Sequence, residues 1–165
     1  MTSRLHQLRP SPILQESKHP AVKLLRQIPG IGPIRAALLV ALLQTLHRFR
    51  TKRQLWAYSG FALETHDSGE YRMVRGKVRL NRERLTVRGL NDNHNHDLKN
   101  LFKGAAQSAS TRPGPLYDFY IALLEKGMRP TMARLTLARK IATITLTMWK
   151  KGVDFDAQQL NRQAA

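Results

Sequence analysis

Cysteine is absent from this 165-residue chain, and acidic residues are scarce, with 11 aspartates and glutamates in total. Without cysteine the chain can form neither disulfides nor zinc sites with thiolate ligands. Long apolar runs are also missing, since the longest one, residues 34–43, is interrupted by Arg35 and is too short to cross a membrane. The first 14 residues hold no continuous apolar segment of the kind found in signal peptides. These absences predict a cytoplasmic protein that makes no membrane contact.

Basic residues dominate the charge, because 28 lysines and arginines oppose the 11 acids and give a formal net charge of +17. A charge of this sign and size attracts polyanions, of which nucleic acid is the commonest for a soluble chain. Binding to a membrane surface would require the cations to line one face of an amphipathic helix, whereas here they are spread among aromatic residues and loops. The charge therefore predicts a nucleic-acid partner.

A two-glycine segment, IPGIGPIRAA at residues 28–37, lies between two apolar stretches. Glycine permits the backbone angles of a tight turn, and Pro33 suits the first turn of a following helix. The free N–H groups and positive end of that helix would point toward the hairpin and could hold a phosphate. The pattern is typical of a helix-hairpin-helix that binds the nucleic-acid backbone, here through Gly30, Ile31, Gly32 and Arg35. An ordinary helical hairpin with a glycine turn explains the same residues equally well.

Helical periodicity covers most of the chain, so the sequence predicts a mainly α fold, a helical bundle. The expected helices occupy residues 17–28 with Ser17 as cap, 33–46, 52–58, 92–109, 115–126 and 130–151. The basic residues of the last helix, among them Arg139 and Lys150, are expected on its solvated side. We expect residues 1–16 to be a flexible arm or linker stub, residues 17–152 the functional domain and residues 153–165 a tail.

Residues 61–90 differ from the rest and predict a basic β-hairpin or loop, because they combine glycines and β-branched residues with many arginines. The cations between residues 72 and 88 are Arg72, Arg75, Lys77, Arg79, Arg82, Arg84 and Arg88, against one acid. Arginine binds phosphate oxygens in a bidentate manner, and a strand pair can follow a groove or a single strand. The residues to which we assign nucleic-acid contacts are Arg72, Arg75, Lys77, Arg79 and Arg88, together with Lys52 and Arg53. The alternative is that these charges only solubilise the surface.

Ser68 stands in the sequence Asp67-Ser68-Gly69, which is typical of a turn because aspartate bonds its own backbone and glycine tolerates a positive φ. A turn could also present the Ser68 hydroxyl to a phosphate, with nearby arginines neutralising the charge that develops on its oxygens. His66 and Asp67 are neighbours in sequence, but geometry decides which group acts as a base. Ser68 is thus a candidate nucleophile, beside the simpler interpretation as a turn residue.

Two further groups of residues have simple structural explanations. His94 and His96 supply two ring nitrogens, too few for a closed metal site, so we predict no metal ligands and expect this polar segment to cap the next helix. Trp56 and Tyr58 could stack on bases, although aromatic residues at this spacing usually pack in a core.

Several short motifs follow one another in a characteristic order. They are Ile28-Pro29-Gly30-Ile31-Gly32-Pro33, Tyr58-Ser59-Gly60, Ser68-Gly69, Arg75-Gly76-Lys77, Arg88-Gly89-Leu90-Asn91 and Ala138-Arg139-Lys140-Ile141. In this order and spacing they resemble the C-terminal transposase domain of the IS-one-ten group of bacterial insertion-sequence recombinases. The likeness extends over residues 24–152, with a wider separation of Gly76 from Arg88 than in many relatives.

This resemblance implies a DNA recombinase in which the serine of the Ser-Gly motif, here Ser68, attacks a strand and becomes covalently joined to its phosphate. In the family a separate RuvC-like domain carries four acidic residues that bind divalent ions, usually Mg²⁺, which assist the attack. A structured guide RNA is the implied partner that selects the DNA, and several subunits assemble around the duplexes.

The set of four strand-borne carboxylates is missing from this chain, which has 11 acids in all. We therefore expect a domain or truncated reading frame that holds no cofactor itself and is inactive in strand exchange alone. Two other functions stay open, a noncatalytic helix-hairpin-helix DNA-binding protein and a basic RNA-binding protein.

Overall fold

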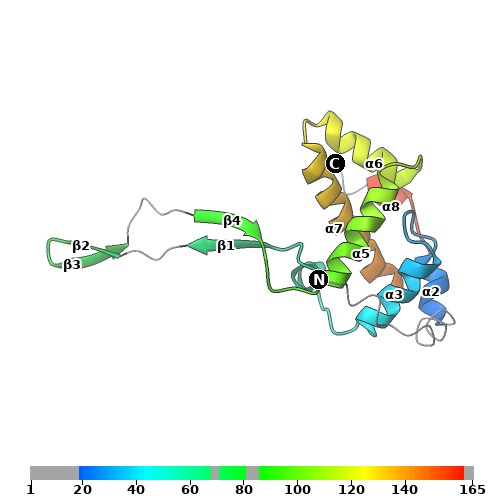
Figure 1. Ribbon diagram of the computed structural model, residues 1–165, viewed down its shortest axis with the longest axis horizontal. Coiled ribbons are helices and arrows are strands. Elements are labelled where there is room, and N and C mark those ends of the chain that lie inside the picture. Colours follow the sequence, from blue (N-terminus) through cyan, green and yellow to red (C-terminus); the bar gives the residue numbers. More distant parts are fainter. Residues whose placement is uncertain (1–18, 68–70, 81–85, 162–165) are drawn as a thin grey trace, which may run out of the picture.

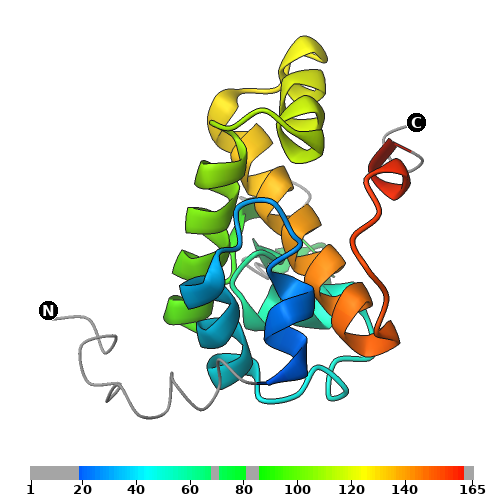
Figure 2. The same cartoon turned by 90° about the vertical axis from the view of Figure 1, so that its right-hand side faces the viewer.

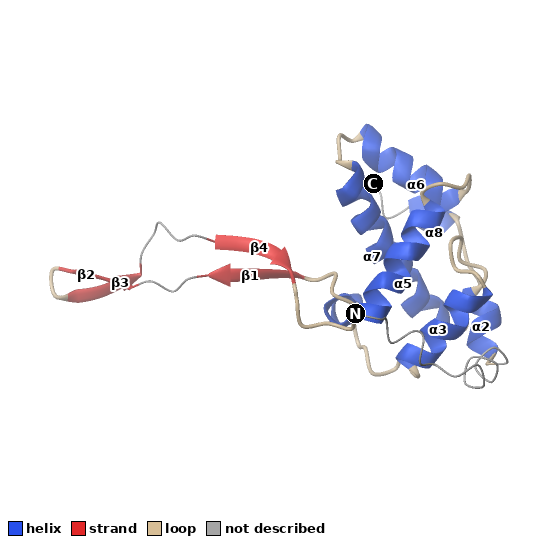
Figure 3. Cartoon of the chain, viewed as in Figure 1, coloured by secondary structure: helices blue, strands red, loops and turns tan. Residues whose placement is uncertain are grey.

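The computed structural model describes residues 19–67, 71–80 and 86–161, so Ser17, Ser68, Arg82 and Arg84 lie outside the described residues. Helices form a body from which a narrow arm of β-strands projects (Figure 1), and Figure 3 shows the two parts in blue and red. The predicted mainly α class is confirmed. Within the described ranges, no helix combines the length and the apolar character that crossing a membrane requires.

The body consists of α2 (Pro20–Leu25), α3 (Pro33–Leu43), α4 (Lys52–Tyr58), α5 (His96–Ala109), α6 (Pro115–Glu125), α7 (Pro130–Lys151) and α8 (Gln158–Asn161). The long α7 packs against α2, α4, α5 and α6 and runs through the middle of the body (Figure 2). Its buried residues recur at three- and four-residue spacing, as in Ala138, Ile141 and Thr145, because that spacing returns to one helix face. The hydrophobic core therefore forms around α7.

The predicted start and end of the first helix are wrong. α2 begins at Pro20 instead of Ser17, since the imidazole of His19 caps it by accepting a hydrogen bond at 3.1 Å from the N–H of Ala21. Histidine is an unusual cap, whereas serine is a common one, and the propensities therefore favoured the wrong residue. The helix also ends at Leu25, three residues before the predicted end.

Two other helices are shorter than predicted. α3 ends at Leu43 because the next residue, Gln44, has a φ of 55° that a right-handed helix does not accept. α5 begins at His96, four residues later than predicted, because Asn95 caps it and accepts a hydrogen bond at 2.9 Å from the N–H of Leu98.

The arm consists of β1 (Leu63–Asp67), β2 (Tyr71–Val74), β3 (Lys77–Leu80) and β4 (Thr86–Leu90). Its base is the antiparallel pair of β1 with β4, and its tip is the antiparallel pair of β2 with β3. Arg75 and Gly76 join β2 to β3 with φ values of 50° and 71°, the positive angles that a two-residue type I′ turn needs at both positions. The predicted excursion at residues 61–90 is thus a ribbon of paired strands.

Two cations of α7 hydrogen-bond to the loops that precede and follow α4. Arg139 donates from Nε and Nη2 to the carbonyl oxygen of Phe61, at 2.8 and 2.6 Å, and Lys150 donates to the carbonyl oxygen of Phe49. Phe61 is fully buried and packs edge-on against Phe102. The prediction that these two cations belong to a solvated side of the helix is therefore wrong.

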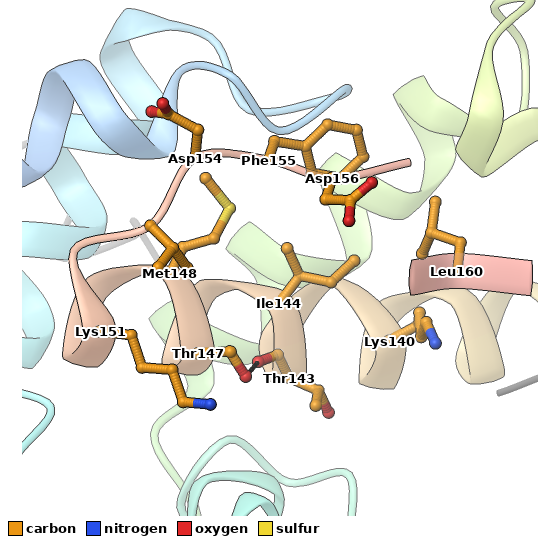
Figure 4. Close-up of a pocket in the computed structure, with 11 residues that line it drawn as sticks. Lys140, Thr143, Ile144, Thr147, Met148, Lys151, Asp154, Phe155, Asp156 and Leu160 are labelled. Atoms are coloured by element: carbon orange, nitrogen blue, oxygen red, sulfur yellow. Dashed lines mark hydrogen bonds between the residues drawn. The ribbon is translucent and has the colours of Figure 1, made fainter. Parts of the chain in front are cut away.

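The segment after α7 folds back onto the body. Gln27 donates to Asp154 at 2.7 Å and accepts from the N–H of Phe155 at 3.0 Å, and Leu160 is buried. A cavity of about 270 Å³ lies between this segment and α7, with Asp154 and Asp156 on its outer wall (Figure 4). Lys140 and Lys151 line the same cavity, so its wall carries charges of both signs and gives no purely cationic surface for phosphates.

We predict that Thr51→Ala lowers the free energy of unfolding by about 1 kcal/mol, because the mutation removes the cap of α4. The Thr51 hydroxyl accepts from the N–H of Gln54, and the Gln54 side chain accepts from the N–H of Thr51 in return, a complete capping box. Urea denaturation measures the loss. Thr51→Ser keeps the hydroxyl and should restore most of the stability, and equal losses in both variants would contradict the role of the cap.

Candidate nucleic-acid interface

The two-glycine hairpin of the α2–α3 junction (residues 26–32) packs against the end of α5. Gly30 has a φ of 90°, and a Cβ added there would lie under 3.0 Å from the carbonyl oxygen of Ala105. Ile31 is buried as well. Gly30 and Ile31, both predicted to contact phosphate, are therefore required for helix packing whatever else they do.

Arg35 ties this junction to α5. Its Nη1 donates to the carbonyl oxygen of Gly30 at 2.9 Å and to the hydroxyl of Ser108 at 3.0 Å. Sequence reasoning missed Ser108, because 73 residues separate it from Arg35 and no local signal joins the two. A phosphate contact of Arg35 stays a prediction beside this structural role.

The exposed part of the junction is Gly32 with the first turn of α3. Gly32 is the N-cap, has an extended backbone with a φ of −81°, and has nothing within 4 Å of the place where a Cβ would stand. Ile34, in the same turn, is 69% exposed. The first N–H groups of a helix have no intrahelical partner and carry the positive end of the dipole, so this turn suits an anion.

The tip of the arm carries the exposed cations Arg75, Lys77 and Arg79. Alternation along β3 places Lys77 and Arg79 on one face of the ribbon and Val78 on the other, where Val78 is directly opposite Met73. Arg79 is in register with Arg72 across the ribbon. The tip is therefore an amphipathic ribbon with a cationic face.

The base of the arm holds the remaining predicted site residues. Arg88 is in register with Thr65, and His66 and Asp67 are consecutive residues of β1, opposite Val87 and Thr86. The nucleophile candidate Ser68 follows β1 directly in the chain and lies outside the described residues.

The arm and the α2–α3 junction lie on opposite sides of the body (Figure 1). The arm connects to the first turn of α5 at His96, whereas the junction packs against Ala105, about 14 Å farther along the helix at 1.5 Å per residue. The two elements that sequence analysis assigned to nucleic-acid binding are therefore two separate surfaces.

Lys52 and Arg53 are exposed on α4, close to the root of the arm. Trp56, on the same helix, is half-buried and donates from Nε1 to the carbonyl oxygen of Arg139 at 3.1 Å. The ring of Tyr58 lies 4.6 Å from the guanidinium of Arg48. A hydrogen bond from Asn95 is the main reason that the pKa of the Tyr58 hydroxyl is lowered.

The rings of His94 and His96 are 4.3 Å apart, and Nδ1 of His94 is 2.8 Å from the carbonyl oxygen of Asn91. In the part of the chain that the structure describes, no three His, Cys, Asp or Glu side chains gather as a metal site would require.

Comparison with known proteins assigns the chain to a family. The model of the Transposase IS116/IS110/IS902 family matches residues 22–120, which include the α2–α3 junction, the arm and α5. The uncharacterized 44.8 kDa protein of insertion element IS116 from Streptomyces clavuligerus is 30% identical over 126 residues. The aligned part is 76% of this chain and 28% of that relative, so the chain spans little more than a quarter of the relative's length. The chain belongs to the Transposase IS116/IS110/IS902 family.

Proposed function

We propose that this chain is the DNA-binding, serine-bearing domain of an insertion-sequence transposase, with residues 17–152 as the functional unit. The observation that carries this proposal is the cationic arm, which projects from a domain of a transposase family (Figure 1). Exposed Arg75, Lys77 and Arg79 at the end of a narrow ribbon can reach phosphates that the body itself cannot.

The register of the tip supports a polyanion as its partner. Arg72 and Arg79 are in register across β2 and β3, so the backbone brings two arginines of the sequence to the same position along the ribbon. In this proposal a phosphate near that position would accept charge-assisted hydrogen bonds from arginine, the side chain best suited to phosphate oxygens. The position of these arginines along the ribbon therefore favours a nucleic-acid backbone as the partner of the arm.

The exposed turn at Gly32 supplies a second backbone contact in this proposal, as part of a helix-hairpin-helix. N–H groups at the start of α3 would bind a phosphate without reading bases. Choice of the DNA sequence then falls to a guide RNA by base pairing, and several copies of the transposase assemble on the DNA.

Ser68 is the proposed nucleophile. Its Oγ forms a bond to the phosphorus, the bond from phosphorus to the leaving deoxyribose oxygen breaks, and the proton lost by the hydroxyl is balanced by one gained at the leaving oxygen. Arginines near the phosphate would stabilise the charge on its nonbridging oxygens. Mg²⁺ belongs, in this proposal, to the RuvC-like domain that four acidic residues define.

We predict that neutralising the tip reduces both the affinity for DNA and its salt dependence. If the chain neutralises six phosphates, the logarithm of the binding constant for duplex DNA falls with the logarithm of salt with a slope of roughly −5. The triple variant Arg75→Gln, Lys77→Gln, Arg79→Gln removes three contacts, so the slope should decrease in magnitude by about 2 to 3. Fluorescence anisotropy of a labelled duplex at several salt concentrations measures both slopes.

A control variant carries the same change in net charge, but at three cations away from the arm. The exposed cations Lys126, Arg129 and Lys151 lie on α7 or beside α6, away from the arm. Their replacement by glutamine should leave the slope within about 1 of the original. If the two triple variants have equal slopes, the arm makes no specific contact and the proposed interface is wrong.

A further inference from the structure

A second surface combines aromatic and basic side chains, on α4, α6 and α7. We call it the α4–α7 groove, and its principal lining residues are Lys52, Trp56, Phe119, Arg139, Lys140 and Thr143. The cavity measures about 560 Å³, within the range of pockets that take small molecules and cofactors. An adjoining hollow of about 380 Å³ shares Trp56 and Arg139 and extends to Leu63 at the root of the arm.

The indole of Trp56 is fixed in the wall of this groove. Its Nε1 bonds the carbonyl oxygen of Arg139, which holds the polar edge of the ring on α7. The Lys52 ammonium is 5.6 Å and the Arg139 guanidinium 5.9 Å from the ring centroid. An indole held by one edge and flanked by cations keeps its orientation. A ligand that stacks on it therefore loses little binding free energy to the ordering of this side chain.

Positive charges converge in the same groove. The Lys140 ammonium is 5.6 Å from the ring of Phe119, and its pKa is lowered, first by burial and then by the positive charge of Lys52. Burial also lowers the pKa of Arg139. These shifts mean that the groove destabilises its own cations, and a bound anion would relieve that cost.

We propose that the α4–α7 groove binds an unpaired nucleotide strand, with one base stacked on Trp56 and its phosphates beside Lys52 and Lys140. Cations that follow the backbone and an aromatic face for a base are the combination that single-strand-binding proteins use. A duplex keeps its bases paired and stacked on one another, so their faces cannot reach an indole set in a groove wall. This inference rests on nucleic acid being the partner of the domain, as proposed above.

The position of the groove suits a strand that continues to the arm. The hollow beyond Trp56 and Arg139 ends at Ala62 and Leu63, the residues from which β1 leaves the body. Ser68 follows five residues after Leu63 in the chain. A strand held by the groove could therefore continue along this hollow toward the root of the arm.

The test uses the fluorescence of Trp56. The chain has two tryptophans, and the other one, Trp149, lies beside His19, 6.0 Å between ring centroids. In the Trp149→Phe variant all tryptophan emission comes from Trp56, and titration with a 12-nucleotide oligothymidylate should quench it in a saturable manner. The matched variant Trp56→Phe, which emits only from Trp149, should show no such change. A labelled oligonucleotide reports binding by anisotropy in both variants.

Further measurements identify which kind of strand the groove binds. Lys52→Gln with Lys140→Gln should weaken binding of the oligonucleotide by about tenfold, and a 12-nucleotide oligouridylate tests whether RNA serves as well as DNA. Quenching of the Trp56 emission by either oligonucleotide supports binding of a strand in the α4–α7 groove. An abasic strand should bind with little quenching, because it has no base to stack on the indole.

Three results would overturn the inference. The first is binding of the oligothymidylate with unchanged Trp56 emission, which would leave the DNA-binding proposal intact. The second is equal quenching by the abasic strand, and the third is equal quenching by a duplex of the same length. Absence of anisotropy change with every nucleic acid would instead overturn the proposed function itself.

Discussion

Ser68→Ala should abolish the covalent protein–DNA product of a recombinase in which this chain is joined to the RuvC-like domain of its family. Alanine has no hydroxyl to attack the phosphorus, and loss of a serine nucleophile lowers the rate of such reactions by about 10⁴-fold or more. The affinity for DNA should stay within about twofold, because the cations of the arm are unchanged. A denaturing gel detects the adduct, and a mobility shift detects binding.

A control variant that loses a different hydroxyl tests whether the loss of the adduct is specific to Ser68. Thr131 is exposed on α7, at a distance along the chain from the arm, and Thr131→Ala should form the adduct at the original rate. An undiminished adduct with Ser68→Ala would show that another residue is the nucleophile. Loss of DNA binding in that variant would show instead that Ser68 has a structural role.

Gly30→Ala should reduce the free energy of unfolding by about 2 to 4 kcal/mol. Its φ of 90° is strained for a residue with a Cβ, and that Cβ would meet the backbone of Ala105 at under 3.0 Å. Ala105 belongs to α5 and is fully buried, so the helix cannot move away without repacking the core. Urea denaturation followed by circular dichroism measures the difference.

The neighbouring glycine is the control. Gly32 has an extended backbone and open space around the position of a Cβ, so Gly32→Ala should change the free energy of unfolding by less than about 1 kcal/mol. The two glycines look alike in the sequence, yet one is required for packing and the other faces solvent. Equal effects of the two substitutions would contradict this assignment.

Local signals in the sequence predicted several elements well. Thr51 marks the start of α4, and Pro130 and Gly152 mark the limits of α7, because caps and left-handed stops depend on residues within one turn of the helix end. The ends of α2, α3 and α5 were missed because His19, Gln44 and Asn95 give weaker or less usual signals.

The roles of individual cations were harder to predict. Arg139 and Lys150 hydrogen-bond to backbone carbonyl oxygens of distant segments, whereas sequence analysis placed them on the solvated side of the last helix. The partner of Arg139 is 78 residues away and that of Lys150 is 101 residues away. No periodicity or local motif reports such a bond.

By itself the sequence determined the charge, the absence of cysteine chemistry, the helical class and the strand character of residues 61–90, because composition and short-range periodicity are properties of neighbouring residues. Only the tertiary structure decided that the arm and the α2–α3 junction lie on opposite sides of the body (Figure 1). It alone also placed Trp56 beside Arg139, 83 residues later in the chain. The physical reason is that α7 packs against helices from both halves of the chain, so contacts between distant residues depend on the whole core.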